Sequence, residues 1–536
     1  MDVSSPRTET SSMEPSSKLF CCRSVRRCIP LVYRQELYHI LCMTGPLVAS
    51  RILNYLLPFV ITMFCGRLGN SVLAGYGMAS ATINITTAAT GGGLALAADT
   101  LISQTYGGKN LRRVGIILQR SVLILLIFCL PCWGLLINTQ PLLLLLGQDP
   151  EVDMQLLYHF YSRVFFWLLY FSGSAAANTI SQVYICVFLY LYIRWKKLHV
   201  ETWGGWSCGS LQEWDGYMKL AIPSTMMLCF EWWIYEVGGF LAGMLGELDL
   251  AAQHAVIMLA FINYMFPLGI QGAACVRVGN ALGAGDTAGA IRTSKVSLSS
   301  ALAVLQGLVL ASTKTVIGFL FTSDGHIVAL VSKLLNIYCV LQFFDGLVCV
   351  SMGILLGSGQ QKIAAVANFF GYYCIGLPLG TSLMFAVKLD VVGFWLGLLI
   401  CVCVQSSFFI AVIFKINWER VTKEVYFSIS GAKADKKTKI KCFCCHAITV
   451  ISFQKCNMNS SDQNEEPDVE EKLSTAQLIL RRGLTTLAAL LILAVGIAVH
   501  LTVPLPEVSY AVRANTTLDS NFTTPSSLIH STSISI

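Results

Sequence analysis

The chain has 536 residues, of which 55% are hydrophobic and 12% are charged, and its mean hydropathy is +0.64. Soluble domains carry roughly 25% charged residues, so this composition excludes an ordinary soluble protein and indicates one that crosses a membrane many times. The net charge of +7 does not indicate a nucleic-acid surface, because the basic residues form short clusters beside apolar runs, as orientation signals do. Most of the 20 cysteines lie inside apolar runs, so we expect no disulfide framework and no metal site.

The amino-terminal tail, residues 1–38, is mostly polar and lacks an apolar stretch long enough for a signal peptide, so we expect it to stay in the cytoplasm. After it come apolar segments of about 20 residues, the length that spans a hydrocarbon core about 30 Å thick. A further stretch, 155–171, is short and carries charged and aromatic side chains, which is typical of an interfacial helix. The predicted spanning helices are 39–65, 72–98, 115–137, 175–193, 217–245, 251–276, 296–321, 327–357, 363–387, 391–415 and 483–503.

The first half of the chain matches the second half. Three sets of residues recur in the same order at shifts of 177, 176 and 175 positions. They are Pro46, Gly66, Gly69 and Ala74 with Pro223, Gly243, Gly246 and Ala251; Gln104–Asn110 with Asn280–Asp286; and Asp149 with Asp324. Many transporters are built from such repeats. We therefore predict two related lobes, 39–195 and 217–415, joined by a loop at 196–216.

The register of this repeat changes after Asp149. The helix that begins at Gly173 best matches the one at Gly393, a shift of 220 instead of 175, so the first lobe lacks about 45 residues relative to the second. An omitted exon or a faulty gene model is the preferred explanation, and true divergence of the two lobes is the alternative. We therefore describe the first lobe as incomplete.

Basic clusters give an independent test of the topology. One cluster follows the second span and begins at Lys109, and another begins at Arg194. Because both clusters are typical of cytoplasmic loops, an even number of crossings should separate them. Three apolar segments lie between, so either 155–171 does not cross or the chain misses its intended topology.

The carboxy-terminal part begins with a long polar segment, 416–482, in which a basic run precedes an acidic run. Segregated charge without sustained apolar periodicity predicts a disordered cytoplasmic loop. This loop precedes the final spanning helix, 483–503. The tail, 504–536, contains Asn-X-Thr patterns at Asn515 and Asn521, which are glycosylation acceptors if the tail is extracellular.

Three acidic residues lie inside predicted spans: Glu231, Glu236 and Asp345. An ionisable residue at the centre of a spanning helix costs about 2.5 to 3.5 kcal/mol, so these three are the best candidates for a substrate or proton site. Glu231 and Glu236 are separated by about 140° around an ideal helix, so both cannot face one ligand. The alternative for each residue is a neutral carboxyl group hydrogen-bonded inside the bundle.

Four further residues are candidates for the same site. Trp232 and Tyr235 flank the carboxyl groups, and aromatic faces attract organic cations by about 0.5 to 2 kcal/mol, although helix packing alone would also explain them. Asn84 is a polar residue that either lines a cavity or bonds a neighbouring helix. Asp99 ends the second span, and a structural role is favoured for it over substrate binding.

Four segments resemble the vertebrate multidrug and toxin extrusion (MATE) family. They are Asp99–Gly107, Cys229–Gly238, Val276–Asp286 and Gly357–Lys362. The resemblance covers about 35–415 and the last helix, apart from the gap. It implies an all-α, two-lobed bundle with one extra carboxy-terminal helix.

The resemblance also implies an exchange of protons for organic cations, and it places Glu231 and Glu236 on acidic positions of the family. Asp345 stands where relatives have glutamate, and Met258 stands where they carry a further glutamate. The missing acid at Met258 puts one proton or substrate contact in doubt.

The leading hypothesis is a multi-pass antiporter of the plasma membrane that moves organic cations and xenobiotics out of the cell. Protons would enter an outward-facing cavity and bind Glu231, Glu236 or Asp345, with no cofactor besides this coupling ion. The alternative is a transport-dead isoform that acts as a misfolded or partner-binding product. An intramembrane enzyme is a distant third, because the spans contain no paired metal ligands and no nucleophile motif. The sequence assigns no oligomeric state.

Overall fold

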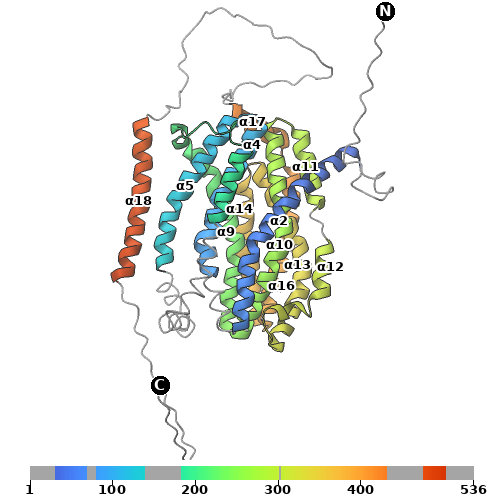
Figure 1. Ribbon diagram of the computed structural model, residues 1–536. Coiled ribbons are helices and arrows are strands. Elements are labelled where there is room, and N and C mark those ends of the chain that lie inside the picture. Colours follow the sequence, from blue (N-terminus) through green and yellow to red (C-terminus); the bar gives the residue numbers. More distant parts are fainter. Residues whose placement is uncertain (1–29, 69–79, 139–182, 301–303, 431–474, 503–536) are drawn as a thin grey trace, which may run out of the picture.

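The computed structural model describes residues 30–68, 80–138, 183–300, 304–430 and 475–502, and it forms a bundle of long helices (Figure 1). Within these ranges no strand occurs, which confirms the all-α prediction. Eight helices in the described ranges are long and apolar enough to cross a membrane. The predicted interfacial segment 155–171 lies outside the described residues, as do Asp149 and the region from which the repeat predicts that residues are missing.

The amino-terminal lobe contributes three long helices that can be compared with the predicted spans. α2 covers Leu31–Leu68, a continuous helix from Ser80 runs through a π-helical turn, η2 (Asn84–Ala88), into α4 (Ala89–Gly107), and α5 covers Leu111–Ile137. A shorter apolar helix follows at Val183–Trp195. α2 therefore begins inside the predicted tail 1–38.

The carboxy-terminal lobe begins after a short 3-10 helix, η3 (Cys208–Leu211). Its elements are α9 (Trp214–Leu245), α10 (Glu247–Gly283), α11 (Thr287–Ser300), α12 (Val304–Thr313), η4 (Ile317–Leu320), α13 (Gly325–Gly357), α14 (Gln361–Asn368), η5 (Phe369–Gly376), α15 (Leu377–Thr381), η6 (Ser382–Ala386) and α16 (Asp390–Lys415). α14 to η6 form one continuous helix with two π-helical stretches. α9 is long enough to span, but its glutamates and tryptophans make it less apolar than the eight helices above.

Two predicted elements differ from the structure. The predicted span 296–321 does not continue as a helix to its end, because α12 ends at Thr313 and a turn and the short helix η4 follow. The predicted disordered loop 416–482 begins with a regular helix, α17 (Trp418–Ser430), and ends inside α18 (Thr475–Thr502). α17 was missed because its apolar residues alternate with charges, and only one face is apolar: Trp418, Val421 and Val425 are buried.

The repeat predicted from the sequence is present in the structure as reciprocal contacts. α4 and α10 cross where Gly107 lies against the backbone of Asn280 and Gly283 lies against the backbone of Gln104; a Cβ atom at either glycine would overlap the facing carbonyl oxygen. Gln104 and Asn280 are equivalent by the shift of 176, as are Gly107 and Gly283. Gly107 of the first lobe thus contacts the equivalent of Gln104 in the second lobe, and Gly283 contacts Gln104 itself. A two-fold axis produces such reciprocal contacts.

A second pair of contacts has the same symmetry. Gly93 of α4 lies against Thr225 of α9, and Gly269 of α10 lies against Val48 of α2. Val48 and Thr225 are 177 residues apart, and Gly93 and Gly269 are 176 apart. α2 therefore corresponds to α9 and α4 to α10, and these four helices form much of the contact between the two lobes.

Candidate functional site

Glu231 and Asp345 line the same small cavity in the carboxy-terminal lobe, although 114 residues separate them in the sequence. The cavity has a volume of about 30 Å³ and lies between α9, α10 and α13. Both residues are almost fully buried, and their carboxyl groups are close enough for their charges to interact. The hydroxyl group of Tyr264 donates a hydrogen bond to Glu231. The sequence candidates Glu231 and Asp345 thus form one site.

Trp232 and Tyr235 also line this cavity. The indole ring of Trp232 packs edge to face against Phe261, with ring centroids 6.3 Å apart, and Tyr235 packs against Trp395 at 6.4 Å. Both aromatic residues therefore have packing partners, and both also border the space next to the carboxyl groups.

Glu236 faces a different part of the protein. Its carboxylate accepts a hydrogen bond of 3.0 Å from the side-chain amide of Asn84, which belongs to the amino-terminal lobe. Asn84 begins the π-helical turn η2, and such turns are frequent at functional sites. Glu231 and Glu236 are about 140° apart around the helix axis. Glu231 therefore points into the carboxy-terminal lobe, and Glu236 points to the contact between the lobes.

Asp99 is not part of either carboxyl group's surroundings. It is exposed on α4, and the positive charge of Arg51 on α2 interacts with it electrostatically. Its neighbour Thr100 is buried and donates a hydrogen bond of 3.1 Å to the backbone oxygen of Leu356 on α13. Asp99 thus lies on an exposed face of α4, near the charge of Arg51 on α2. Its function stays a prediction.

Met258 lies at the contact between α2 and α10. Its sulfur accepts hydrogen bonds from the hydroxyl groups of Tyr55, at 3.2 Å, and Thr62, at 3.6 Å. Met258 is 4% exposed. Two hydroxyl donors thus converge on a weak acceptor, at the position where the resemblance predicts a carboxylate.

Sequence reasoning missed three polar residues around the carboxyl groups. Tyr264 bonds Glu231, and Tyr338 of α13 donates a hydrogen bond of 3.1 Å to the backbone oxygen of Ala260 on α10. Asn263 donates in turn to the hydroxyl of Tyr338 at 3.3 Å. The signal was present in the run from Phe261 to Tyr264, which places an amide and a phenol in the middle of an apolar helix.

The end of the bundle near Gly107 and Gly283 is closed by further bonds. The side-chain amide of Gln104 donates 3.0 Å to the backbone oxygen of Gly357. Glu36 of α2 accepts two hydrogen bonds, of 2.5 and 2.6 Å, from Arg277 of α10, and a third, of 2.7 Å, from Thr293 of α11. The two lobes are therefore joined here by close backbone packing and by a largely buried ion pair.

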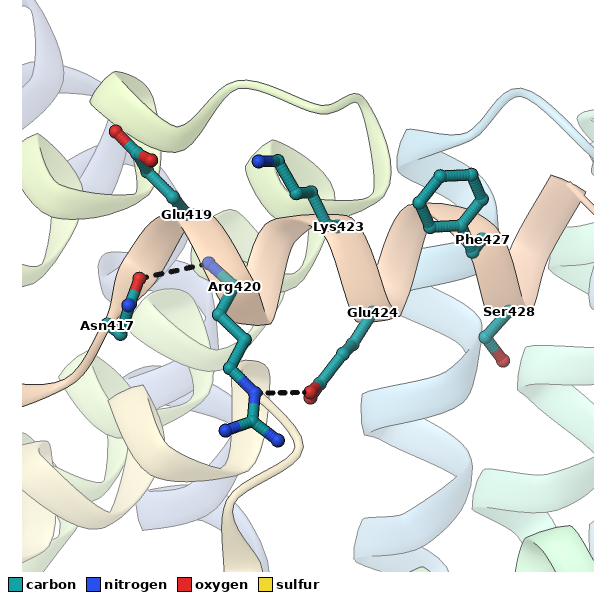
Figure 2. A pocket seen from close by; sticks show the side chains of 7 residues that line it. All are labelled: Asn417, Glu419, Arg420, Lys423, Glu424, Phe427 and Ser428. Atoms are coloured by element: carbon teal, nitrogen blue, oxygen red, sulfur yellow. Dashed lines mark hydrogen bonds and ion pairs between the residues drawn. The ribbon is translucent and has the colours of Figure 1, made fainter. Parts of the chain in front are cut away.

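α17 lies across this closed end and contacts α4, α10 and α11. The guanidinium group of Arg113 on α5 donates to the backbone oxygens of Ser428 and Ile429, in the last turn of α17. Figure 2 shows the outer face of α17, where Arg420 pairs with Glu424 at 2.7 Å beside a hollow of about 650 Å³. α17 thus connects both lobes at one end of the bundle.

Comparison with known proteins identifies the family. The model of the MatE family matches residues 46–188 and 223–381, so each half of the chain matches it separately, and together the matches cover more than half of the chain. The chain belongs to the MatE family. The two matches begin 177 residues apart, which is the shift of the repeat at Pro46 and Pro223.

Several relatives carry the name multidrug and toxin extrusion protein 1. The chain is 41% identical to that of Danio rerio over 556 residues, which covers 90% of this chain and 94% of the relative. It is 41% identical to that of Homo sapiens over 541 residues, covering 88% and 95%. MATE proteins are transporters, so the prediction that this chain is not an enzyme is confirmed.

Solved MATE transporters share the fold. The eukaryotic transporter AtDTX14 superposes with a TM-score of 0.67 at 24% identity, covering 74% of this chain and 99% of the other. A MATE transporter of Vibrio cholerae superposes with a TM-score of 0.59 at 16% identity, covering 72% and 99%. These matches confirm the MATE-type helix bundle predicted from the sequence.

The alignment with the Danio rerio relative also bears on the shortened lobe. Ninety per cent of 536 residues is about 480, whereas the alignment runs over 556 positions, so roughly 70 positions of the alignment have no residue of this chain. Residues are therefore missing from this chain inside the aligned region. Their number is large enough to include the 45 residues inferred from the repeat.

Proposed function

We propose that this chain exports organic cations and xenobiotics across the plasma membrane in exchange for protons. The proposal is supported by relatives that are 41% identical over about nine-tenths of the chain and are named for multidrug and toxin extrusion. The observation that carries it is the pair of buried carboxyl groups, Glu231 and Asp345, in one cavity of a spanning bundle.

In this proposal Glu231 and Asp345 bind the coupling protons. Their cavity of about 30 Å³ has room for a water molecule but not for an organic cation. Two carboxylates that share a buried space repel each other, and burial disfavours the charged form of each. The pair is therefore suited to exchange protons when the cavity becomes connected to water.

Glu236 is the proposed link between the substrate and the relative position of the lobes. Its bond to Asn84 is a contact between lobes, so a cation that pairs with Glu236 replaces an amide donor that holds the lobes together. Trp232 stands four residues before Glu236 on α9, and it is the aromatic side chain proposed for a cation–π contact. Binding of the cation and loss of an interlobe bond are thereby coupled.

The closed end is proposed to face the cytoplasm, because the basic cluster that begins at Lys109 lies there, and basic loops stay on the cytoplasmic side. The structure then corresponds to a state that is shut toward the cytoplasm. For a cation to enter from inside, the contacts of Gly107 and Gly283 with the opposite lobe must separate. Alternating access of this kind is a rocking of one repeat against the other.

The test is proton-driven transport by the full chain in proteoliposomes, with a radiolabelled quaternary ammonium ion and an imposed pH gradient. We expect Glu236→Gln and Asp345→Asn each to lower the initial rate about 10- to 100-fold, the factor that corresponds to loss of a hydrogen bond to a charged group. The matched control is Asp215→Asn, because Asp215 is an exposed carboxylate near the start of α9 that pairs with Lys219. Transport by both neutral variants at the rate of the control would refute the assignment.

A second candidate function rests on the prediction from the repeat that the first lobe lacks about 45 residues. In this alternative the chain is a transport-dead isoform that is retained inside the cell or binds a partner. The test is surface biotinylation of cells that express the chain, combined with glycosidase treatment of the tail that carries Asn515 and Asn521. Glycosylated chain at the surface together with proton-driven cation transport would eliminate this alternative, and retention without transport would favour it.

A further inference from the structure

A second, large cavity shares no lining residue with the cavity of the buried carboxyl groups. It has a volume of about 1920 Å³ and is lined by described residues of α4, α5, α9, α17 and α18. This volume is about sixty times that of the cavity at Glu231. The space is therefore large enough for a ligand and not only for a few water molecules.

The body of this cavity is apolar. Its walls include Ile124 and Phe128 of α5, Met226 of α9 and Ala489 of α18. These residues lie well inside spanning helices, at the depth of the hydrocarbon core. A hydrocarbon chain is the ligand whose chemistry matches such a wall.

The mouth of the cavity is basic. Arg113 and Arg120 of α5 share a single carboxylate, that of Glu213, at 3.3 Å each. Arg481 and Arg482, in the second turn of α18, lie on the opposite wall, and Arg481 has no ion-pair partner among the residues that the structure describes. Two other acids at the mouth are already paired, since Asp215 bonds Lys219 and Glu424 bonds Arg420. Apart from the two paired acids, the mouth therefore has four guanidinium groups and one carboxylate, that of Glu213.

Two of these arginines are held in place for a ligand. Arg120 is 4% exposed, and its Nε atom has no hydrogen-bond partner. Arg482 stacks over the ring of Trp214 at 4.2 Å and donates from Nε to the backbone oxygen of Leu211. A buried donor without a partner is unfavourable, and a fixed guanidinium group is well suited to bind a phosphate.

α18 is fastened to α5 at the other end of the cavity. Gly134 and Gly496 approach so closely that a Cβ atom on Gly496 would lie 2.8 Å from the backbone of Gly134, and Asn138 donates 2.8 Å to the oxygen of Gly496. The two helices thus touch near Gly496, while Arg481 and Arg482, in the second turn of α18, line the cavity. The arrangement leaves a wedge with a basic rim and an apolar interior.

We propose that this wedge binds an acidic phospholipid of the cytoplasmic leaflet. The headgroup phosphate lies between Arg120, Arg481 and Arg482, and an acyl chain extends along Phe128 and Met226. Basic pockets between spanning helices on the cytoplasmic side have the charge and position to hold anionic headgroups. The lipid proposal and the transport proposal both assume that the end of α18 with Arg481 and Arg482 faces the cytoplasm. They share nothing else, and the lipid proposal is tested without measuring transport.

The experiment measures lipid binding to the purified full-length chain by native mass spectrometry in detergent. Phosphatidylserine and phosphatidylcholine with identical acyl chains are titrated separately, and glycerophosphoserine serves as a headgroup without chains. We expect selective binding of phosphatidylserine. The double variant Arg481→Gln, Arg482→Gln should weaken it about 30-fold, because each basic residue near a membrane surface contributes about fivefold.

Two further variants separate charge from shape. Met226→Trp fills the apolar interior and leaves every arginine in place, so we expect it to weaken phosphatidylserine binding as well. Arg292→Gln with Lys295→Gln is the matched control, because it removes two positive charges from α11, which also contacts α17 but does not border the wedge. If the Arg481, Arg482 variant fails to fold, the exposed Arg481→Gln alone should still lower the affinity about fivefold.

Three results would overturn the proposal. Equal affinity for phosphatidylserine and phosphatidylcholine would show that the arginines select no headgroup. Unchanged binding in the Arg481, Arg482 variant or in Arg481→Gln would place the lipid elsewhere. Binding of glycerophosphoserine as tight as that of phosphatidylserine would show that the apolar interior holds no chain.

Discussion

Replacing Gly283 by alanine tests whether the crossing of α4 and α10 closes one end of the transporter. Gly283 is the last residue of α10, and a Cβ atom there would lie 2.8 Å from the carbonyl carbon of Gln104 and nearer still to its oxygen. Carbon atoms in contact prefer about 3.5 to 4.0 Å, so the two helices must move apart by about 1 Å. The perturbation is one methyl group at the closest point between the lobes.

Helix propensity and packing predict opposite signs for this substitution. Alanine is favoured over glycine in a helix by about 0.5 to 1 kcal/mol, whereas overpacking a tight contact costs about 1 to 3 kcal/mol. We expect packing to dominate, because the facing atoms belong to the backbone and cannot change rotamer. A net cost of about 1 to 2 kcal/mol would shift the equilibrium between closed and open ends by about five- to thirtyfold.

The assay is hydrogen–deuterium exchange of the purified protein, read by mass spectrometry. We expect faster exchange in the turn after Gly107, where the amide of Asn110 bonds the oxygen of Thr105, and a lower melting temperature. Gly45→Ala is the matched control, because a Cβ atom at Gly45 has no atom within 4 Å. Identical exchange and melting for Gly283→Ala and Gly45→Ala would refute the closure.

Two further substitutions test the buried contacts between lobes. Glu36→Gln should lower the free energy of unfolding by about 3 kcal/mol, because it leaves the half-buried Arg277 without its counter-charge. The control Glu424→Gln removes an exposed ion pair and should change the free energy of unfolding by less than about 1 kcal/mol. Equal melting temperatures of the two variants would contradict this expectation. Met258→Glu should be less destabilising than Met227→Glu by about 3 kcal/mol, because two hydroxyl groups already point at the sulfur of Met258 and each can donate to a carboxylate. Chemical denaturation of the two variants measures the difference, and equal stabilities would show that these hydroxyl groups do not define an acid site.

The sequence was sufficient for the parts of the fold that depend on periodic signals. Apolar length predicted most of the spans, and the recurrence of Pro46 at Pro223 predicted the two lobes. The contacts between equivalent residues of the two lobes could be seen only in the structure. Gly283, for example, must lack a side chain because the backbone of Gln104 on another helix lies against it. The helix α17 was missed for a related reason: its buried face is narrow, and its charges resemble those of the polar loop that follows.

The candidate site was predictable residue by residue but not as an arrangement. Glu231 and Asp345 were selected because a spanning helix tolerates few carboxyl groups, yet nothing in the sequence shows that they share a cavity. Tyrosines such as Tyr264 are common in apolar helices, so the residue type alone does not indicate a site. Only the hydrogen bond from Tyr264 to Glu231 places it there. Pairing across 114 residues is a property of packing, and single-sequence periodicity carries no information about it.

The symmetry of the repeat identifies which side of the closed end should open first. Glu36, in the first turns of α2, and Glu213, directly before α9, are equivalent by the shift of 177. Each bonds arginine of the other lobe: Glu36 bonds Arg277, and Glu213 bonds Arg113 and the buried Arg120. The side chain of Glu36 is 9% exposed, whereas that of Glu213 is 58% exposed. Because water replaces an exposed ion pair at little cost and a buried one at high cost, the contact between α9 and α5 should separate before that between α2 and α10, and the lobes should pivot about the latter.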